Sequence, residues 1–378
     1  MKILIVSEMS VPYAVGGGEV RYGLLARELA RRGHDVTWLS MRQRQSPDEE
    51  VIDGVRHLHR GPQIQNPPSR PPLAMLRYMF TAFWHVLTHR YDVVDCQTYA
   101  PLPAVWLASM LSRQRMVATI HNVWCGSGTG ILASSIRTAV VALEAVLYRI
   151  PYHRILTVSE SSATALARRG ARPDRLRVVP NGIVLPPPPP ATDATSRVYD
   201  AVFVGRLVGL KRIDHVIECL ERLSGEGILR RAAIVGEGPL FESARTQADA
   251  AGLGARVEFP GGLPNPRVLE VVQSSRIYLH ASVSEGFPVV MVEAMACGTP
   301  VVAYDILGVR EVVENGRDGI LVPCLDVEAL AEAAGRLLRD PEARQRMADA
   351  GREKVKRSLT LDAMTARVEA VYAEASRQ

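Results

Sequence analysis

The chain has 378 residues, of which 47% are hydrophobic and 22% charged. This composition excludes a disordered or fibrous protein, and the length favours two domains, because single cores rarely grow beyond about 250–300 residues. The formal net charge is +5, but residues 1–185 alone hold 22 Lys and Arg against 13 Asp and Glu, a net of +9. This asymmetry suits an anionic acceptor or a membrane surface, and equally a merely solvated basic face. Because no nucleic-acid-binding module accompanies the charge, we expect no nucleic-acid partner.

The N-terminus begins with a short apolar run, which ends at Ser7 and Glu8. Such a run is too short for a signal sequence or a membrane span and is typical of a first buried strand. We therefore expect a cytoplasmic protein, with association to a membrane left open. No cysteine belongs to a CxxC pair or a His–Cys cluster, which predicts reduced, mostly buried thiols and no structural zinc. The cysteines are Cys96, Cys125, Cys219, Cys297 and Cys324.

Short β-branched runs alternate with longer amphipathic segments along the whole chain. This alternation predicts an α/β protein with parallel sheets covered by helices on both faces. In the first half, strands are predicted at residues 2–8, 35–40, 55–59, 92–97, 116–121, 154–159 and 176–182. In the second half, they are predicted at residues 200–205, 231–238, 256–262, 277–282, 299–305 and 319–323. Two similar Rossmann-like domains in tandem follow from this pattern.

A run of five prolines separates the two halves. It predicts a semi-rigid linker at residues 186–197, between an N-terminal domain (1–185) and a C-terminal domain (198–357). The last segment, residues 358–378, carries apolar side chains at helical spacing, so it predicts a terminal helix that could pack on either domain. A ligand site between two such domains, at the carboxyl ends of their strands, is the ordinary expectation.

Three glycines, Gly16, Gly17 and Gly18, precede the first predicted helix. Their N–H groups could approach an anion at the helix N-terminus, or the glycines could simply permit a tight turn. The dinucleotide fingerprint is not met, because Arg21 stands where its third glycine belongs and the strand at residues 35–40 ends without an acidic residue. An NAD-dependent oxidoreductase is therefore a poor interpretation.

A second strand–glycine–helix turn contains Arg206 and Lys211. It lacks the spacing of a Walker loop, and no Ser or Thr follows Lys211. Both cations are nevertheless expected at the carboxyl end of the strand, beside a helix N-terminus. Two fixed positive charges in this place suit a diphosphate, which gains negative charge as it leaves.

Two glutamates, Glu285 and Glu293, stand in an otherwise apolar stretch. Pro288 fits the first turn of a helix, which places Glu285 on the preceding loop and directs the N–H groups near Gly286 and Phe287 toward the cleft. The two carboxylates are then about two turns, or roughly 10 Å, apart along the helix axis. This separation is too large for an acid–base pair that shares a proton, so it predicts two different tasks.

These residues resemble the family-4 glycosyltransferases of the GT-B fold, mostly retaining enzymes that move a sugar from a nucleotide donor to an acceptor. The resemblance covers nearly the whole chain. It rests on seven motifs in order, namely the glycine loop at 16–19, ATIHN at 118–122, TVSES at 157–161, VVPNGI at 178–183, FVGRLVGLKR at 203–212, IVGEGP at 234–239 and the two glutamates. It implies two Rossmann-like domains facing across a cleft, with the C-terminal helix crossing back to the first domain.

The resemblance also implies a role for each matched residue. Arg206 and Lys211 would hold the donor diphosphate and neutralise the departing nucleotide. Glu285 would contact the transferred sugar, Glu293 would bind the ribose hydroxyls, and His121 would lie against the donor sugar from the N-terminal domain. Further donor-binding positions are Gly17, Gly18, Gly236, Gly286, Phe287 and Pro288.

The sequence departs from the family pattern at Asn122 and Val184, where many members have an Asp. The family needs no bound metal, and no Asp-x-Asp element is present, so we expect neither a metal nor another cofactor. The predicted activity is metal-independent, retaining transfer from a UDP-sugar by front-face attack. A GT-B sugar-nucleotide epimerase and a non-catalytic nucleotide-sugar-binding protein remain as alternatives.

The acceptor is expected on the N-terminal domain, where residues 43–54 and 63–90 are its predicted determinants. A glycan, a lipid-linked sugar and a small natural product all fit a hydroxyl acceptor. A predicted helix at residues 77–90 mixes aromatic rings with arginine, which suits a lipid interface. Core packing is the favoured interpretation of this helix, because Met79, Phe83, Val86 and Leu87 form an ordinary buried stripe.

Overall fold

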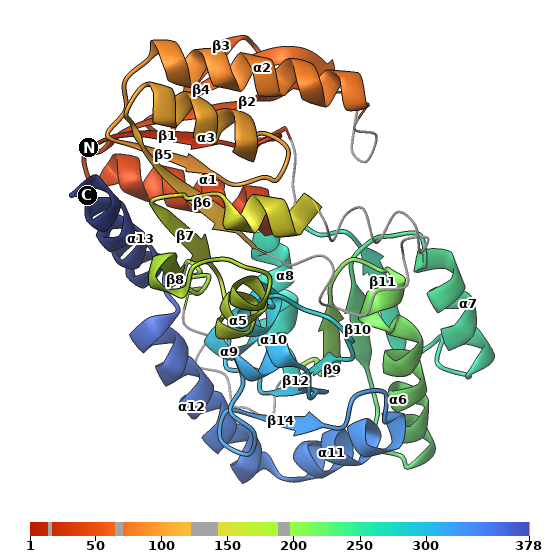
Figure 1. The fold of residues 1–378 in the computed structure, drawn as a ribbon. Coiled ribbons are helices and arrows are strands. Elements are labelled where there is room, and N and C mark those ends of the chain that lie inside the picture. The colour runs from red at the N-terminus through yellow and green to blue at the C-terminus, as the bar shows by residue number, and fades with distance from the viewer. Residues whose placement is uncertain (14–16, 65–70, 122–142, 188–196, 378) are drawn as a thin grey trace. The chain divides into compact units, whose positions relative to one another are not determined.

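The computed structural model describes residues 1–13, 17–64, 71–121, 143–187 and 197–377. Asn122, Cys125 and most of the predicted linker therefore lie outside the described residues. Contacts divide the chain into two units, Met1–Gly182 with Leu361–Gln378, and Ile183–Thr360. Each unit contains a mainly parallel sheet flanked by helices (Figure 1), as the predicted α/β fold class requires.

The described residues of the first unit form an eight-stranded sheet with the order β3-β4-β2-β1-β5-β6-β7-β8. Neighbouring strands are parallel except for the antiparallel pair β3 and β4. The strands are β1 (Lys2–Val6), β2 (Asp35–Gln43), β3 (Glu49–Ile52), β4 (Val55–Ile64), β5 (Val93–Cys96), β6 (Arg115–Ile120), β7 (Arg154–Thr157) and β8 (Leu176–Val178).

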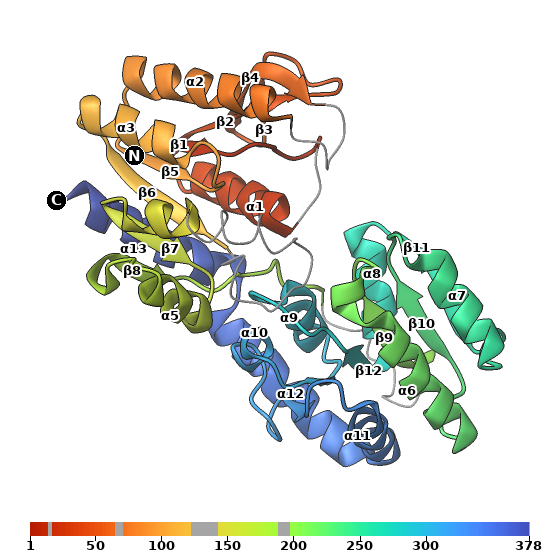
Figure 2. The ribbon, with the colours of Figure 1, turned by 45° about the vertical axis from the view of Figure 1, so that its right-hand side comes forward.

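Successive side chains of each strand point to opposite faces of the sheet, so apolar strands present two faces to bury. Helices cover both faces of this sheet. Leu4 and Val6 of β1 pack in one core with α2 and α3, whereas Ile3 and Ile5 pack in another with α1 and α13. Figure 2 shows these two helical layers with the sheet between them. The helices are α1 (Gly17–Arg31), α2 (Pro72–Thr88), α3 (Leu102–Leu111), α5 (Glu160–Arg168), the 3₁₀ turn η2 (Pro173–Arg175) and α13 (Leu361–Ser376).

The C-terminal helix α13 belongs to the first unit, which confirms that the chain crosses back. Met364, Val368 and Tyr372 are buried in the core that they share with α1. The Tyr372 hydroxyl donates a hydrogen bond to the fully buried carboxylate of Asp95 at 2.6 Å, and Thr119 donates another at 2.7 Å. The helix is therefore held by both apolar packing and a buried polar contact.

In the second unit, the described residues form a six-stranded parallel sheet with the order β11-β10-β9-β12-β13-β14. Its strands are β9 (Tyr199–Val204), β10 (Ala232–Val235), β11 (Val257–Gly261), β12 (Ser275–His280), β13 (Val301–Tyr304) and β14 (Gly319–Val322). Its helical segments are η4 (Gly209–Lys211), α6 (Ile213–Gly225), α7 (Phe241–Ala250), α8 (Asn265–Gln273), α9 (Val289–Ala296), α10 (Leu307–Arg310), α11 (Val327–Arg339) and α12 (Pro341–Ser358).

Three local features differ from the sequence-based expectations. The strand β3 was not predicted; it forms a hairpin with β4 through Asp53 and Gly54, both of which have positive φ. The helix α1 begins at Gly17, so Gly17 and Gly18 lie within its first turn rather than ahead of it. Pro288 occupies the N-cap position of α9, one residue before the helix.

The buried stripe of α2 is also shifted from its predicted position. Its fully buried residues are Tyr78, Ala82 and Val86, whereas Phe83 and Leu87 are only partly buried. Tyr78 can be buried because its hydroxyl donates to the backbone carbonyls of Ser7 and Leu39. Within the described ranges, no helix is long and apolar enough to cross a membrane.

Candidate active site

The strand order of the second unit places a topological switch point between β9 and β12. The chain moves outward from β9 to β10 and β11 and then returns to the other side of β9 as β12. The loops that leave the carboxyl ends of β9 and β12 therefore diverge, and open parallel sheets bind ligands between such loops. Arg206 and Lys211 follow β9, and Glu285 follows β12, so all three belong to loops at this edge.

Backbone hydrogen bonds hold the loops of this edge together. The loop after β9 is joined to the loop after β10 by the bond from Leu207 N–H to the Glu237 carbonyl, at 2.8 Å. It is joined to the loop after β12 by the bond from Val283 N–H to the Leu210 carbonyl, at 3.0 Å. These bonds hold the backbone at Leu207 and Leu210, immediately ahead of Lys211.

Gly236 permits the closest approach between two of these loops. Its φ is 139°, and a Cβ built there would lie 1.9 Å from the carbonyl oxygen of Gly205. No side chain fits such a contact, and the φ value is strained for any residue with a Cβ. Packing alone therefore explains this glycine, and its role in donor binding stays a prediction.

Glu285 is the centre of a charged cluster in the second unit. Its Oε1 accepts hydrogen bonds from the Lys211 ammonium group and, at 3.0 Å, from Nε2 of His280. The side chains are largely buried, with 13% of Glu285, 22% of Lys211 and 2% of His280 exposed. Residues 74 positions apart in the sequence thus form one ion pair.

The surroundings of Glu285 keep its carboxylate ionised. Burial by itself raises the pKa of Glu285, but the His280 hydrogen bond and the Lys211 charge outweigh burial and lower this pKa to about 2. Burial lowers the pKa of His280, which favours a neutral imidazole that donates from Nε2. Its Nδ1 lies 3.4 Å from the Tyr278 hydroxyl, which also donates to the Val204 carbonyl at 3.0 Å.

Glu293 has a different environment on the second turn of α9. Its Oε1 accepts a hydrogen bond from Nδ2 of Asn265 at 3.0 Å. Burial raises the pKa of Glu293, and the Asn265 hydrogen bond opposes this shift. The two glutamates therefore have separate partners, as expected for separate tasks.

The other predicted residues of this unit lie close to the cluster in sequence. Arg206 is exposed and pairs with no carboxylate among the described residues, so its guanidinium is available to a ligand. Gly286, the buried Phe287 and Pro288 connect Glu285 to α9. Within the described ranges, no group of three or more His, Cys, Asp or Glu side chains could hold a metal ion.

The remaining predicted residues belong to the first unit. His121 follows β6, and its ring lies edge-on to Tyr22 with a centroid distance of 5.3 Å. Burial, followed by the charge of Arg21, lowers the pKa of His121 to about 3, so this imidazole is neutral. Gly17 starts α1, and a Cβ at Gly18 would meet no atom within 4 Å. Packing within the described residues therefore does not require glycine at Gly18.

Sequence reasoning missed His280 and Asn265, the partners of the two glutamates. His280 ends a buried strand only five residues before Glu285, and a polar side chain at a strand's carboxyl end was a usable signal. Asn265 lies 28 residues before Glu293, and no spacing rule connects the two positions.

Two mainly parallel sheets, each flanked by helices, match solved structures of the GT-B fold. Residues 15–185 match the family described as Glycosyltransferase Family 4, and residues 192–354 match Glycosyl transferases group 1. The chain belongs to the family-4 glycosyltransferases, which confirms the resemblance.

Named relatives and solved structures match nearly the full chain. A D-inositol 3-phosphate glycosyltransferase of Xylanimonas cellulosilytica is 29% identical, covering 96% of this chain and 93% of the relative. A glycogen synthase of Mycobacterium tuberculosis is 28% identical, with 100% and 95% covered. The structure of Anabaena HepE with UDP and glucose matches with a TM-score of 0.75, 20% identity and 99% of both chains covered. Sucrose-phosphate synthase of Thermosynechococcus elongatus matches with a TM-score of 0.83, 20% identity and 98% of both covered.

Proposed function

We propose that this protein is a retaining glycosyltransferase that moves a sugar from a UDP-sugar to a hydroxyl acceptor in the cytoplasm, without a metal or another cofactor. The observation that carries the proposal is the cluster of Lys211, Glu285 and His280 at the switch point of the second unit. The cluster combines a fixed cation, which can stabilise a leaving diphosphate, with an ionised carboxylate, which can accept hydrogen bonds from a sugar. HepE was solved with UDP and glucose, which supports the choice of UDP over other nucleotides.

Lys211 and Arg206 have complementary roles in this proposal. The donor's glycosidic bond breaks between the anomeric carbon and a phosphate oxygen, and negative charge develops on the departing diphosphate. Lys211 is held in place by Glu285, whereas Arg206 is exposed and able to close on the phosphates. Removing one fixed group that stabilises such charge typically costs about 3–4 kcal/mol, or a hundredfold to a thousandfold in rate.

Glu285 acts as an ionised hydrogen-bond acceptor for the sugar hydroxyls. A carboxylate with a pKa of about 2 is a weak base at neutral pH, so it is a poor candidate for removing the acceptor's proton. The departing phosphate is a stronger base, because a phosphate's second pKa is about 6. Front-face attack follows: the acceptor oxygen bonds to the anomeric carbon on the face that the diphosphate leaves, and the phosphate oxygen takes the acceptor's proton.

The remaining residues position the donor. Glu293, held by Asn265, binds the ribose hydroxyls, while Gly286, Phe287 and Pro288 present the start of α9 to the nucleotide. His121 contributes a neutral imidazole to the donor sugar. Gly17 and Gly18 permit close approach of substrate, which the open space at Gly18 supports. The named relatives act on different acceptors, so their names do not select between a glycan, a lipid-linked sugar and a small natural product.

A thermal-shift panel of UDP-, GDP-, ADP- and TDP-sugars tests donor choice. A ligand at 100 times its dissociation constant adds about 2.7 kcal/mol of stability, which raises the melting temperature. We expect the largest rise with a UDP-sugar. Equal or larger stabilisation by another nucleotide would overturn the choice of UDP.

Activity is then measured as transfer to a panel of acceptors, with the product's anomeric configuration determined by NMR. Glu285→Gln and Lys211→Ala should fold and lose transfer by at least a hundredfold. Glu218→Gln and Arg222→Ala are matched controls, because these residues form an exposed ion pair at 3.2 Å on α6. Full activity in either site variant contradicts the assignment, and an inverted product contradicts front-face retention.

A further inference from the structure

The outer face of α2 exposes a row of large apolar side chains. Leu73, Leu76, Phe80 and Trp84 are 68%, 60%, 64% and 47% exposed. Their spacings of three, four and four residues place them on one side of the helix, opposite the buried Tyr78, Ala82 and Val86. A surface helix of a globular domain normally carries polar residues on this side.

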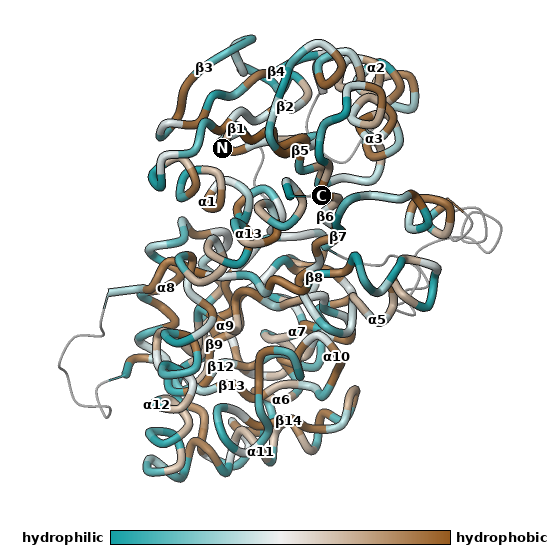
Figure 3. Tube along the Cα trace, turned by 60° about the vertical axis from the view of Figure 1, so that its left-hand side comes forward, coloured by the Kyte–Doolittle hydropathy of each residue, from teal (hydrophilic) through white to brown (hydrophobic). Residues whose placement is uncertain are grey.

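The neighbouring helix α3 extends the apolar surface. It packs beside α2 on the same face of the sheet, and Figure 3 shows long hydrophobic stretches along both helices. Leu107, Met110 and Leu111 are 40%, 52% and 58% exposed, and α3 contains no charged residue. We call these seven exposed apolar residues of the two helices the α2–α3 face. Large exposed apolar side chains gathered on two adjacent helices indicate an interaction site.

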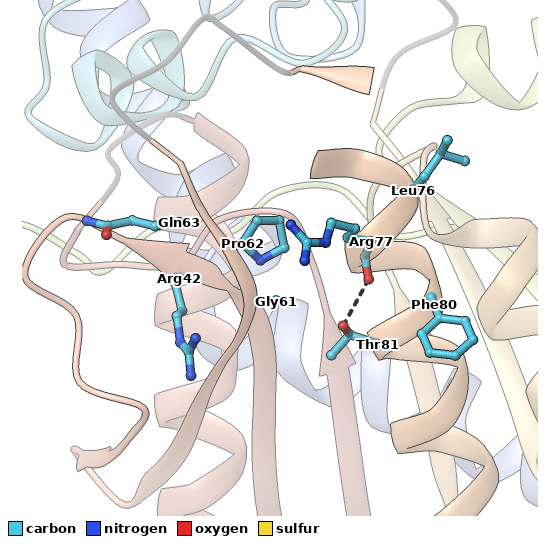
Figure 4. Close-up of a pocket in the computed structure, with 8 residues that line it drawn as sticks. All are labelled: Arg42, Gly61, Pro62, Gln63, Leu76, Arg77, Phe80 and Thr81. Carbon is cyan, nitrogen blue, oxygen red and sulfur yellow. Dashed lines mark hydrogen bonds between the residues drawn. The ribbon is translucent and has the colours of Figure 1, made fainter. Parts of the chain in front are cut away.

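A basic pocket adjoins the α2–α3 face and shares Leu76 and Phe80 with it. Figure 4 shows this pocket, of about 670 Å³, between α2 and the ends of β2 and β4. Two guanidinium groups line it. Arg42 forms an ion pair with Asp48 at 2.9 Å, whereas Arg77 forms no ion pair with a described residue. The other lining residues are Gly61, Pro62, Gln63 and Thr81.

The charge around the α2–α3 face has one dominant sign. Residues 71–115, which span α2 and α3, contain four arginines and two aspartates, a net of +2. One aspartate, Asp95, is fully buried, and the other, Asp92, accepts a hydrogen bond from the backbone N–H of Lys2. Arg77 is the sole Asp, Glu, Lys or Arg on α2. Arg56 and Arg60 on β4 pair with Glu49, whereas Arg77, Arg90 and Arg113 form no ion pair with a carboxylate among the described residues. An extended anionic surface would therefore meet three unpaired arginines.

We infer that the α2–α3 face docks onto an anionic lipid bilayer, with Arg77 and Arg42 holding a lipid phosphate in the adjoining pocket. The apolar side chains would enter the boundary between headgroups and acyl chains, where aromatic rings such as that of Trp84 are favoured. Each arginine near such a surface adds electrostatic attraction to the anionic headgroups. This inference goes beyond the proposed transfer reaction and does not depend on it.

Vesicle co-sedimentation of the full chain tests the inference. We expect binding to vesicles that contain phosphatidylglycerol, little binding to pure phosphatidylcholine, and weaker binding at high salt, because salt screens exposed charges. The double variant Phe80→Ser/Trp84→Ser should lower partitioning at least tenfold, and the variant Arg77→Gln should lower it about fivefold. Leu307→Ser, at a 67% exposed leucine of the second unit, and Arg222→Gln should leave it unchanged.

Several outcomes would overturn the docking surface. Vesicle binding that is unaffected by the α2 variants places the contact elsewhere. A dimer in solution that Phe80→Ser/Trp84→Ser dissociates identifies a second copy as the occupant. Stabilisation by inorganic phosphate that requires Arg77, without vesicle binding, indicates a site for free phosphate only.

Donor binding is measured in parallel on the same variants. We expect UDP to stabilise Phe80→Ser/Trp84→Ser as it stabilises the unchanged protein, which also shows that the variant is folded. Failure of vesicle binding with UDP binding intact would refute only the docking surface. Vesicle binding without any UDP binding would instead refute the proposed function.

Discussion

Replacing Glu285 by glutamine removes the negative charge that Lys211 and His280 surround. Lowering a carboxyl pKa from 4.5 to about 2 corresponds to about 3 kcal/mol of folding free energy at neutral pH. The side chain is only 13% exposed, so screening by solvent reduces this value less than at a surface pair. We expect Glu285→Gln to destabilise the protein by about 2–3 kcal/mol at pH 7.

The direction of the pKa shift determines how the stabilisation by Glu285 changes with pH. Because the folded pKa is lower than the unfolded one, the stabilisation is fully present above about pH 4.5 and is lost as the pH falls toward 2. At pH 3 about half of it should remain. The gap in unfolding free energy between the unchanged protein and Glu285→Gln should therefore narrow between pH 7 and pH 3.

Urea unfolding followed by circular dichroism at several pH values measures this gap. Glu218→Gln serves as the control, because its partner Arg222 and Glu218 itself are 45% and 43% exposed. Exposed pairs contribute about 0–1 kcal/mol, so we expect a small effect from this variant. A Glu285→Gln gap that stays constant from pH 7 to pH 3, or that never exceeds 0.5 kcal/mol or so, would refute the reasoning.

Three further variants test other contacts. Gly236→Ala should destabilise by about 2 kcal/mol or more, because its Cβ would lie 1.9 Å from the Gly205 carbonyl oxygen; a normal unfolding midpoint would contradict this packing. Tyr372→Phe removes the hydrogen bond to buried Asp95 and should lower the free energy of unfolding by about 1–3 kcal/mol in the same assay. An unchanged free energy of unfolding would show that apolar contacts alone hold α13. Asn265→Ala should weaken UDP binding in calorimetry by releasing Glu293, and an unchanged Kd would separate Asn265 from the donor site.

The sheets could be predicted largely because buried parallel strands leave a strong sequence signal. β10 and β13 are continuous, fully buried apolar runs, as expected for strands of a parallel sheet. β3 lacks this signal, because its sequence EEVI is short and half exposed. The pair Asp53 and Gly54 nevertheless carried a recognised hairpin signature, and strands flank it on both sides.

The inner face of α2 could not be placed correctly from apolar spacing alone. The predicted stripe of Met79, Phe83, Val86 and Leu87 leaves out Tyr78, whose buried hydroxyl is satisfied by the backbone carbonyls of Ser7 and Leu39. That contact depends on β1 and β2 lying beneath the helix, which local sequence does not specify. As a result, Phe80 and Trp84 are left exposed on the opposite side.

The site was predictable one residue at a time but not as a cluster. Lys211 and Glu285 each follow a predicted strand, yet their ion pair requires β9 and β12 to be neighbours. Strand order is a tertiary property, so spacing along the chain could not reveal the pair. His280 was missed for a related reason: a histidine at the end of an apolar strand looks like a core residue until its carboxylate partner is placed.

Calorimetric titration with UDP and with uridine tests the central claim most directly, that Lys211 at the switch point holds the donor diphosphate. The difference in binding free energy between the two ligands reports the contribution of the phosphates. We expect the unchanged protein to bind UDP at least a hundredfold more tightly than uridine, and Lys211→Ala to lose most of that difference while binding uridine normally. If Lys211→Ala keeps the full preference for UDP, Lys211 does not hold the diphosphate and the proposed mechanism is wrong.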